Sequence, residues 1–286
     1  MQPYLRGVLL IAAISLALSA CKREAAPAAA TPTPAPAPAL ETPPALPAPP
    51  LGEPPKVTGE LQDVLETSNR MVVGITYPRG LQRYPGLAQV LSDYSFARRQ
   101  ELKREVDALG NDNPAVPYDL TLSYQKLVDT PELVAIAADG DLYTGGAHGQ
   151  PLVMRYVWLA KENRMLTASE LIPTSAGWAV IANYARQQLK IAAKERIEED
   201  KALTTEEVAR LMSSDGKSID EGTAAKPENF EHFEPLLNSQ QKVRALRFVF
   251  PPYQIGPYAY GVQFIDVPSA VLLPQVDPAY RGLFAP

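Results

Sequence analysis

The chain has 286 residues, of which 46% are hydrophobic and 21% charged, with 29 prolines, one cysteine, two histidines and a formal net charge of −5. One cysteine excludes an intramolecular disulfide framework, a Cys-rich zinc site and an iron–sulfur cluster, and two histidines leave little room for a multi-histidine metal centre. Residues 57–286 carry 23 Lys and Arg against 29 Asp and Glu, a net charge of −6. Such a charge disfavours nucleic-acid binding and suits either a basic partner or simple solubility.

The first 20 residues have the pattern of a secretory signal. Arg6 is followed by an uncharged apolar stretch over residues 7–20, which is too short to predict a spanning helix. It ends in Leu-Ser-Ala-Cys at residues 18–21, which resembles a bacterial lipobox. We therefore expect a lipid on Cys21, the alternative being a plain signal peptide with an incidental cysteine. Lys22 favours delivery to the outer membrane, with the domain facing the periplasm.

Proline richness is a local feature of this chain. Twelve of the 29 prolines lie between Pro27 and Pro55, in a segment made mostly of alanine and proline. Such a segment buries too little apolar surface to fold and favours extended polyproline II, reaching on the order of 90 Å over about 30 residues. We interpret residues 21–56 as a lipidated tether; a ligand for a proline-recognition domain is the alternative.

Residues 57–286 are expected to form the folded domain, in two halves at about 57–140 and 141–286. Residues 71–77 form a β-branched run that Pro78 ends, which predicts a strand. Residues 85–108 predict a helix because apolar side chains recur with helical spacing. These side chains are Leu87, Val90, Leu91, Tyr94 and Ala97.

Alternation predicts strands over residues 120–124 and 152–158, with residues 133–137 between them and a turn at 161–164. Thr167 with Glu170, and Thr204 with Glu207, have the spacing of helix-opening capping boxes.

A longer helix is predicted over residues 177–200, and the polar residues 213–229 are predicted to be a loop. Residues 246–250 and 262–267 predict two further strands, and residues 268–276 a short helix or turn. This order indicates an α+β domain, with helices on one face of a mainly antiparallel sheet.

Two motifs suggest where the domain binds a ligand. The first, Tyr-Thr-Gly-Gly-Ala-His-Gly at residues 143–149, joins two predicted strands, and its glycines allow positive φ or close backbone approach. His148 could be a base, a ligand or a hydrogen-bond donor that stabilises the turn. The second, Phe-Pro-Pro-Tyr-Gln-Ile-Gly-Pro-Tyr-Ala-Tyr-Gly at residues 250–261, is a stiff aromatic loop. Two interpretations are open: the loop forms a recognition surface, or its tyrosines only pack onto the edge of the sheet.

In this order, and followed by Ile-Asp-Val-Pro-Ser-Ala-Val-Leu at residues 265–272, the two motifs resemble the RsiV-type extracytoplasmic domain. The resemblance spans about residues 60–277. In the founding member this domain is the outer part of an anti-sigma factor and binds lysozyme, with loops entering the enzyme's substrate cleft; related copies accompany a peptidoglycan deacetylase domain. This chain shows neither a sigma-binding segment with a transmembrane helix nor the deacetylase, so the resemblance implies only the binding module.

We therefore expect a lipid-anchored, monomeric envelope protein that binds a lysozyme-type muramidase or peptidoglycan and is not an enzyme. No cofactor, metal or nucleic acid is expected. The resemblance places the binding edge at Thr144, Gly145, Gly146, His148, Pro252, Tyr253, Gln254, Ile255 and Tyr258.

Two other functions remain open. One is an enzyme or accessory protein acting on peptidoglycan, because the many carboxylates neither identify nor exclude a hydrolytic pair. The other is a structural envelope lipoprotein that contacts another protein.

Overall fold

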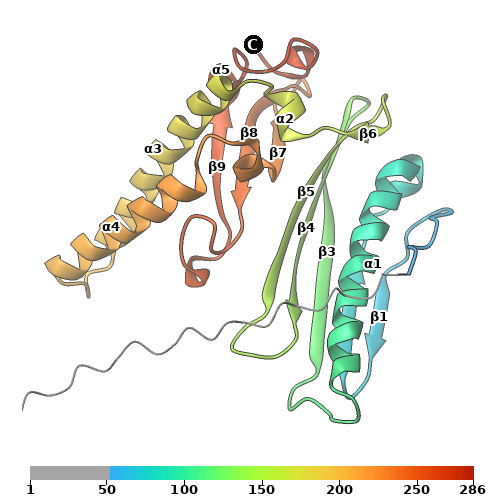
Figure 1. The fold of residues 1–286 in the computed structure, drawn as a ribbon. Helices are drawn as coiled ribbons and strands as arrows, with labels where there is room; N and C mark the ends of the chain where they lie inside the picture. Colours follow the sequence, from blue (N-terminus) through green and yellow to red (C-terminus); the bar gives the residue numbers. More distant parts are fainter. Residues whose placement is uncertain (1–51) are drawn as a thin grey trace, which may run out of the picture. The chain divides into compact units, whose positions relative to one another are not determined.

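The computed structural model describes residues 52–286 (Figure 1). The predicted signal peptide, the lipidation site Cys21 and nearly all of the predicted tether lie outside the described residues. Within residues 52–286, no helix combines the length and the apolar character needed to cross a membrane.

A six-stranded sheet occupies the first part of this domain. Its strands neighbour each other in chain order: β1 (Val64–Thr67), β2 (Met71–Thr76), β3 (Tyr118–Asp129), β4 (Leu133–Tyr143), β5 (Gln150–Leu159) and β6 (Arg164–Met165). All neighbouring pairs are antiparallel except β2 and β3, which are parallel because a helical crossover connects them. The mainly antiparallel sheet expected from the sequence is confirmed.

The crossover is made by η1 (Leu81–Arg83) and α1 (Pro85–Ala108), which has the predicted bounds. Pro85 sits in the first helical turn, where its missing N–H costs nothing. The buried face of α1, which includes Leu87, Leu91 and Leu102, packs with Leu120 of β3 and Ile136 of β4 into one apolar core. α1 therefore covers one face of the six-stranded sheet (Figure 1).

The second part of the domain has a three-stranded sheet of its own. The elements are α2 (Ala168–Leu171), α3 (Ser175–Glu199), α4 (Thr205–Gly222), η2 (Pro227–Phe230), β7 (Phe233–Leu237), β8 (Val243–Phe250), η3 (Tyr258–Tyr260), β9 (Gln263–Pro268), α5 (Ser269–Leu272) and η4 (Arg281–Leu283). The sheet order is β7-β8-β9, all antiparallel. The sequence predicted one sheet, whereas the strands divide into two sheets. The predicted boundary between the two halves of the domain, at about residue 140, falls inside β4. The α+β class is confirmed.

Aromatic rings fill the core of this second part. Trp178 of α3 stacks on Phe230 of η2, and Phe248 and Phe250 of β8 meet Phe230 edge-on. Both predicted capping boxes are confirmed: Thr167 and Glu170 open α2, and Thr204 and Glu207 open α4.

The predicted loop over residues 213–229 is wrong, because α4 continues to Gly222. After Met212 the helix has only one large apolar residue, Ile219, so its second half looks polar in the sequence. Charged pairs join it to α3 instead: Arg196 to Asp215 at 2.9 Å, and Lys190 to Asp220 at 2.7 Å. Side chains that make these contacts give the segment the composition of a loop. The strand β7 was also missed, and so was β1.

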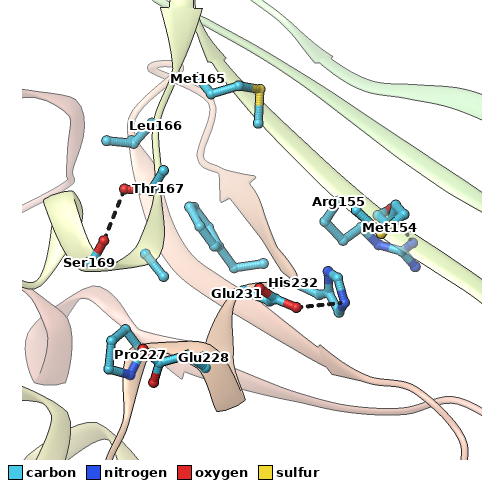
Figure 2. Close-up of a pocket in the computed structure, with 12 residues that line it drawn as sticks. Met154, Arg155, Met165, Leu166, Thr167, Ser169, Pro227, Glu228, Glu231 and His232 are labelled. Atoms are coloured by element: carbon cyan, nitrogen blue, oxygen red, sulfur yellow. Dashed lines mark hydrogen bonds and ion pairs between the residues drawn. The ribbon is translucent and has the colours of Figure 1, made fainter. Parts of the chain in front are cut away.

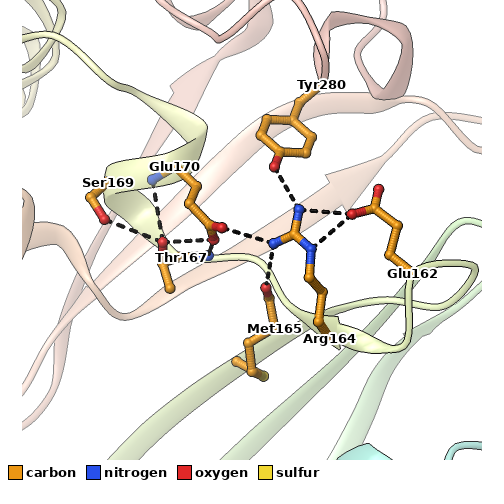
Figure 3. A network of polar contacts seen from close by, with 7 residues as sticks. All are labelled: Glu162, Arg164, Met165, Thr167, Ser169, Glu170 and Tyr280. Carbon is orange, nitrogen blue, oxygen red and sulfur yellow. Dashed lines mark hydrogen bonds and ion pairs between the residues drawn. The ribbon is translucent and has the colours of Figure 1, made fainter.

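Two arginines tie the second part to the six-stranded sheet. Arg155 of β5 pairs with Asp139 of β4 and with Glu234 of β7, and its side chain is only 7% exposed. Arg164 of β6 hydrogen-bonds to Glu170 in the capping box of α2 and to the hydroxyl of Tyr280 near the C-terminus (Figure 3). These contacts fix the end of one sheet against the elements that carry the other.

Replacing the buried Phe248 by alanine should lower the free energy of unfolding by about 3–5 kcal/mol, because it leaves a cavity inside the aromatic core. The matched control is Phe264→Ala on the neighbouring strand β9, where the ring is 56% exposed; its cost should be below about 1 kcal/mol. Urea denaturation of both variants measures the difference, and equal losses would contradict this account of the core.

Candidate functional site

The glycine-rich turn connects β4 to β5. Gly145 and Gly146 have φ of 101° and 93°, a conformation that other residues rarely adopt. Gly149 lies so close to Asp141 that a Cβ atom there would come within 1.6 Å of the Asp141 carboxylate. The glycines that the sequence singled out are thus required by backbone conformation and by close approach.

The aromatic loop connects β8 to β9 and is fixed at its base by three contacts. The Gln254 side-chain amide donates to the carbonyl oxygens of Gly222 (3.1 Å) and Asn229 (2.9 Å). Ile255 is buried in the second core. The Tyr260 ring lies under the Arg196 guanidinium, at 3.9 Å. The loop is therefore held by the α3–α4 pair and the chain that follows it.

The two motifs, about a hundred residues apart in sequence, meet in space. The Tyr253 hydroxyl lies 3.0 Å from Nε2 of His148, and the Tyr258 ring stacks on the imidazole with centroids 4.1 Å apart. Nδ1 of His148 lies 3.0 Å from the Gly149 carbonyl oxygen, which can only accept. In a neutral imidazole Nδ1 therefore carries the proton, and Nε2 accepts the Tyr253 hydroxyl. We call His148, Tyr253 and Tyr258 the aromatic cluster.

Tyr253 has two unusual properties. Its φ is 73°, in the left-handed region that costs a non-glycine residue about 1 kcal/mol or more. Its side chain is nevertheless 59% exposed. A strained backbone that presents an exposed aromatic ring is a common feature of recognition sites, and it indicates a role beyond packing.

A cavity of about 460 Å³ opens beside the cluster. Its lining is supplied by both motifs and by the first residues of β5: Leu142, Thr144, Gly145, His148, Gly149, Gln150, Pro151, Pro251, Pro252 and Tyr253. No Asp, Glu, Lys or Arg from the described part of the chain is among these residues.

The expected site residues divide into three groups. Thr144, Gly145, His148, Pro252 and Tyr253 line the cavity. Gly146 shapes the turn, and Tyr258 supports His148 from behind.

Gln254 and Ile255 point instead into the domain as loop anchors. Sequence reasoning missed Leu142, Gln150 and Pro151, whose only signal is that they adjoin the first motif, and it did not single out Gly149 and Pro251 within the motifs.

A pair of carboxyl groups lies beneath the turn. Burial raises the pKa of Asp141 above its usual range, although the neighbouring His148 opposes the shift. Burial, together with the charge of Asp141, also raises the pKa of Asp119. Neither residue lines the cavity. Over residues 52–286, no three His, Cys, Asp or Glu side chains are grouped so that they could hold a metal ion.

A second cavity, of about 340 Å³, lies where β5 and the start of α2 meet η2 and β7 (Figure 2). It is lined by the buried Arg155, by His232 and by apolar side chains that include Met165 and Phe233. Nε2 of His232 lies 3.6 Å from a Glu231 carboxylate oxygen, beyond hydrogen-bond distance. Burial lowers the pKa of His232 and Arg155 acts in the same direction, whereas Glu231 and Asp139 oppose them.

Comparison with known proteins gives structural similarity alone. No family model matches the sequence, and no curated protein matches it. The fold is similar to that of a DUF3298 family protein from Pseudomonas aeruginosa PAO1, with a TM-score of 0.48, 18% identity, and coverage of 81% of this chain and 98% of that one. It is also similar to a DUF3298 family member from Bacteroides fragilis NCTC 9343, with a TM-score of 0.45, 18% identity, and coverage of 79% and 95%. The names of these proteins state no ligand or activity.

Gly222→Ala should destabilise the domain by about 1–3 kcal/mol, because the new Cβ would come within 2.0 Å of the Gln254 carbonyl oxygen and push the aromatic loop off its anchor. Gly216→Ala, on the same helix with open space around it, should instead stabilise α4 by about 0.5–1 kcal/mol. Urea denaturation compares the two. If the two variants had equal free energies of unfolding, the aromatic loop would not depend on its close contact with Gly222.

The lowered pKa of His232 predicts a pH dependence of stability. As pH falls below 6.5, the unfolded chain takes up a proton on this residue before the folded chain does, so the folded state loses stability until the folded pKa is passed. The free energy of unfolding of the wild type should therefore fall between pH 7.5 and 5.5, and His232→Gln should remove part of that fall. Urea denaturation across this range, with both proteins referenced to pH 7.5, measures it; identical slopes would show that His232 does not contribute.

Proposed function

We propose that this protein is a lipid-anchored binding protein of the cell envelope, whose aromatic cluster and adjoining cavity bind a lysozyme-type muramidase or peptidoglycan, without control of a sigma factor. One observation carries the proposal. The two motifs that resemble the RsiV-type domain lie far apart in sequence, and they come together through the contact between His148 and Tyr253. A shared exposed site gives a reason for the two motifs to occur together.

The alternative is that the cluster only fastens one loop to the other. Against this, the aromatic loop already has anchors at Gln254, Ile255 and Tyr260 that do not involve the cluster. A fastening role also does not require the exposed ring and the left-handed backbone of Tyr253. Rigid aromatic side chains at exposed positions lose little entropy on binding, so they are favoured at recognition surfaces.

The sequence outside the described residues supports the proposed location. The lipobox at Cys21 would attach the chain to a membrane, and the segment rich in alanine and proline would hold the domain away from it. We infer an outer-membrane anchor with the domain in the periplasm. There, the net charge of −6 on residues 57–286 would steer a basic muramidase toward the domain, most strongly at low ionic strength.

We propose binding without hydrolysis. Glycan hydrolysis needs two carboxyl groups placed on either side of a glycosidic bond. Asp119 and Asp141 are the carboxyl pair beneath the turn, and neither faces the cavity in which a glycan would lie. Incubation with purified peptidoglycan should therefore release no muropeptides.

The test is binding of the full-length protein, purified in detergent, to immobilised lysozyme and to purified peptidoglycan sacculi. Tyr253→Ala should weaken binding about tenfold or more, since it removes the exposed ring of the cluster. Phe264→Ala, at a similarly exposed ring on β9, should leave binding unchanged. The choice of site is wrong if both variants bind like the wild type, and the proposed function is wrong if the wild type binds neither target at low salt.

A further inference from the structure

The cavity beside the aromatic cluster has an uncharged lining. Its polar side chains are those of Thr144, Gln150, His148 and Tyr253, and its walls are otherwise apolar or glycine. The domain as a whole carries a net charge of −6, so an uncharged cavity differs from the rest of it. The cavity is open, with Gly145, His148, Gln150 and Tyr253 exposed, and its lining has no charged side chain with which a lysine, arginine or carboxylate group of a ligand could pair. The lining therefore favours a neutral occupant.

The lining keeps unused hydrogen-bonding capacity. The side chains of Thr144 and Gln150 make no hydrogen bond to any residue between 52 and 286. The backbone N–H groups of residues 145–148 likewise have no backbone partner in the described domain, and all four residues are exposed. Gly145 and His148 line the cavity, so their free amides are available there to a ligand with several hydroxyl or carbonyl oxygens.

The Tyr253 ring beside the cavity is held in place although the residue is 59% exposed. The Tyr253 hydroxyl donates to His148, which fixes the ring, and the Tyr258 ring lies against both side chains, with centroids 4.1 Å from His148 and 5.7 Å from Tyr253. Pro151, Pro251 and Pro252 add rigid apolar walls. A ligand that suits this arrangement has a flat apolar face for the ring and polar groups around its edge for Thr144 and Gln150.

We infer that this cavity binds a neutral sugar ring of the N-acetylhexosamine type, so that the ligand of the site is a glycan. A hexosamine ring in its chair form has a C–H face that can pack on Tyr253. Its hydroxyls and acetamido group supply the donors and acceptors that Thr144, Gln150 and the turn amides lack, and the acetyl methyl fits against proline. The volume, about 460 Å³, is within the range of small-molecule sites. This inference rests on the proposed function and chooses between its two ligands.

The experiment titrates the full-length protein in detergent with N-acetylchitotetraose and, separately, with its deacetylated counterpart, by isothermal titration calorimetry. The acetylated, neutral oligomer should bind, and its affinity should persist at high salt. The deacetylated oligomer is cationic, so it should bind only through the charge of the domain and be lost as salt is raised.

Variants locate the sugar. Tyr253→Ala should weaken binding of the acetylated oligomer about tenfold, and Gln150→Ala several-fold. Tyr253→Phe keeps the ring face and should retain most of the affinity, and Phe264→Ala should have no effect. Circular dichroism checks that each variant is folded.

The outcomes separate this inference from the proposed function. No binding of the acetylated oligomer, or binding that is unchanged in folded Tyr253→Ala, overturns the inference. If immobilised lysozyme is then still retained in a manner sensitive to Tyr253→Ala, the site is a protein-binding site and the proposed function stands. If neither the oligomer nor lysozyme nor sacculi bind, both fail.

Discussion

The two sheets of this domain are joined by an ion-pair network around one buried arginine, next to an apolar core that both parts share. Arg155 extends from β5 of the six-stranded sheet and holds Asp139 of β4 on one side and Glu234 of β7 on the other, with almost no exposure to water. A buried arginine is tolerated only when its charge is paired. Glu234 is the more buried partner, at 12% exposed against 48% for Asp139, so its loss would leave Arg155 paired only with a half-exposed carboxylate. The network thereby sets how the two sheets are joined. The network and the apolar core shared by β3–β5 and the second part together hold the strands that carry the turn after β4 and the loop after β8.

Within the aromatic loop, some side chains hold the loop on the domain and others face the candidate site. In the segment from Pro252 to Tyr258, Gln254 and Ile255 face the domain and hold the loop, whereas Tyr253 faces the cavity. His148 has the stabilising role considered from the sequence, yet it also lines the cavity, so the two roles coincide in one residue. The site therefore consists of rigid aromatic and proline surface next to unused polar groups, an arrangement suited to binding a preformed ligand.

The sequence predicted those elements whose apolar pattern is strong. Helix α1, the strands around Leu120 and Trp158, and both capping boxes follow from local spacing, and the structure confirms them. The second half of helix α4 was not predicted because Asp215 and Asp220 contact α3 through ion pairs and not through apolar side chains. The motifs identified the loops that line the candidate site, but not the inward direction of Gln254 or the contribution of Gln150. Side-chain direction in an irregular loop depends on distant partners such as Gly222, which no local pattern records.

The anchored loop also bears on the kinetics of binding. Because Tyr253 is already positioned by anchors on α4 and by His148, a ligand does not have to order the loop when it arrives. Association then requires no slow conformational step, and differences in affinity among related ligands appear mainly as differences in residence time. Under the proposed function, a membrane-tethered protein with such a site would sample passing ligands rapidly and retain those whose contacts fit the fixed surface.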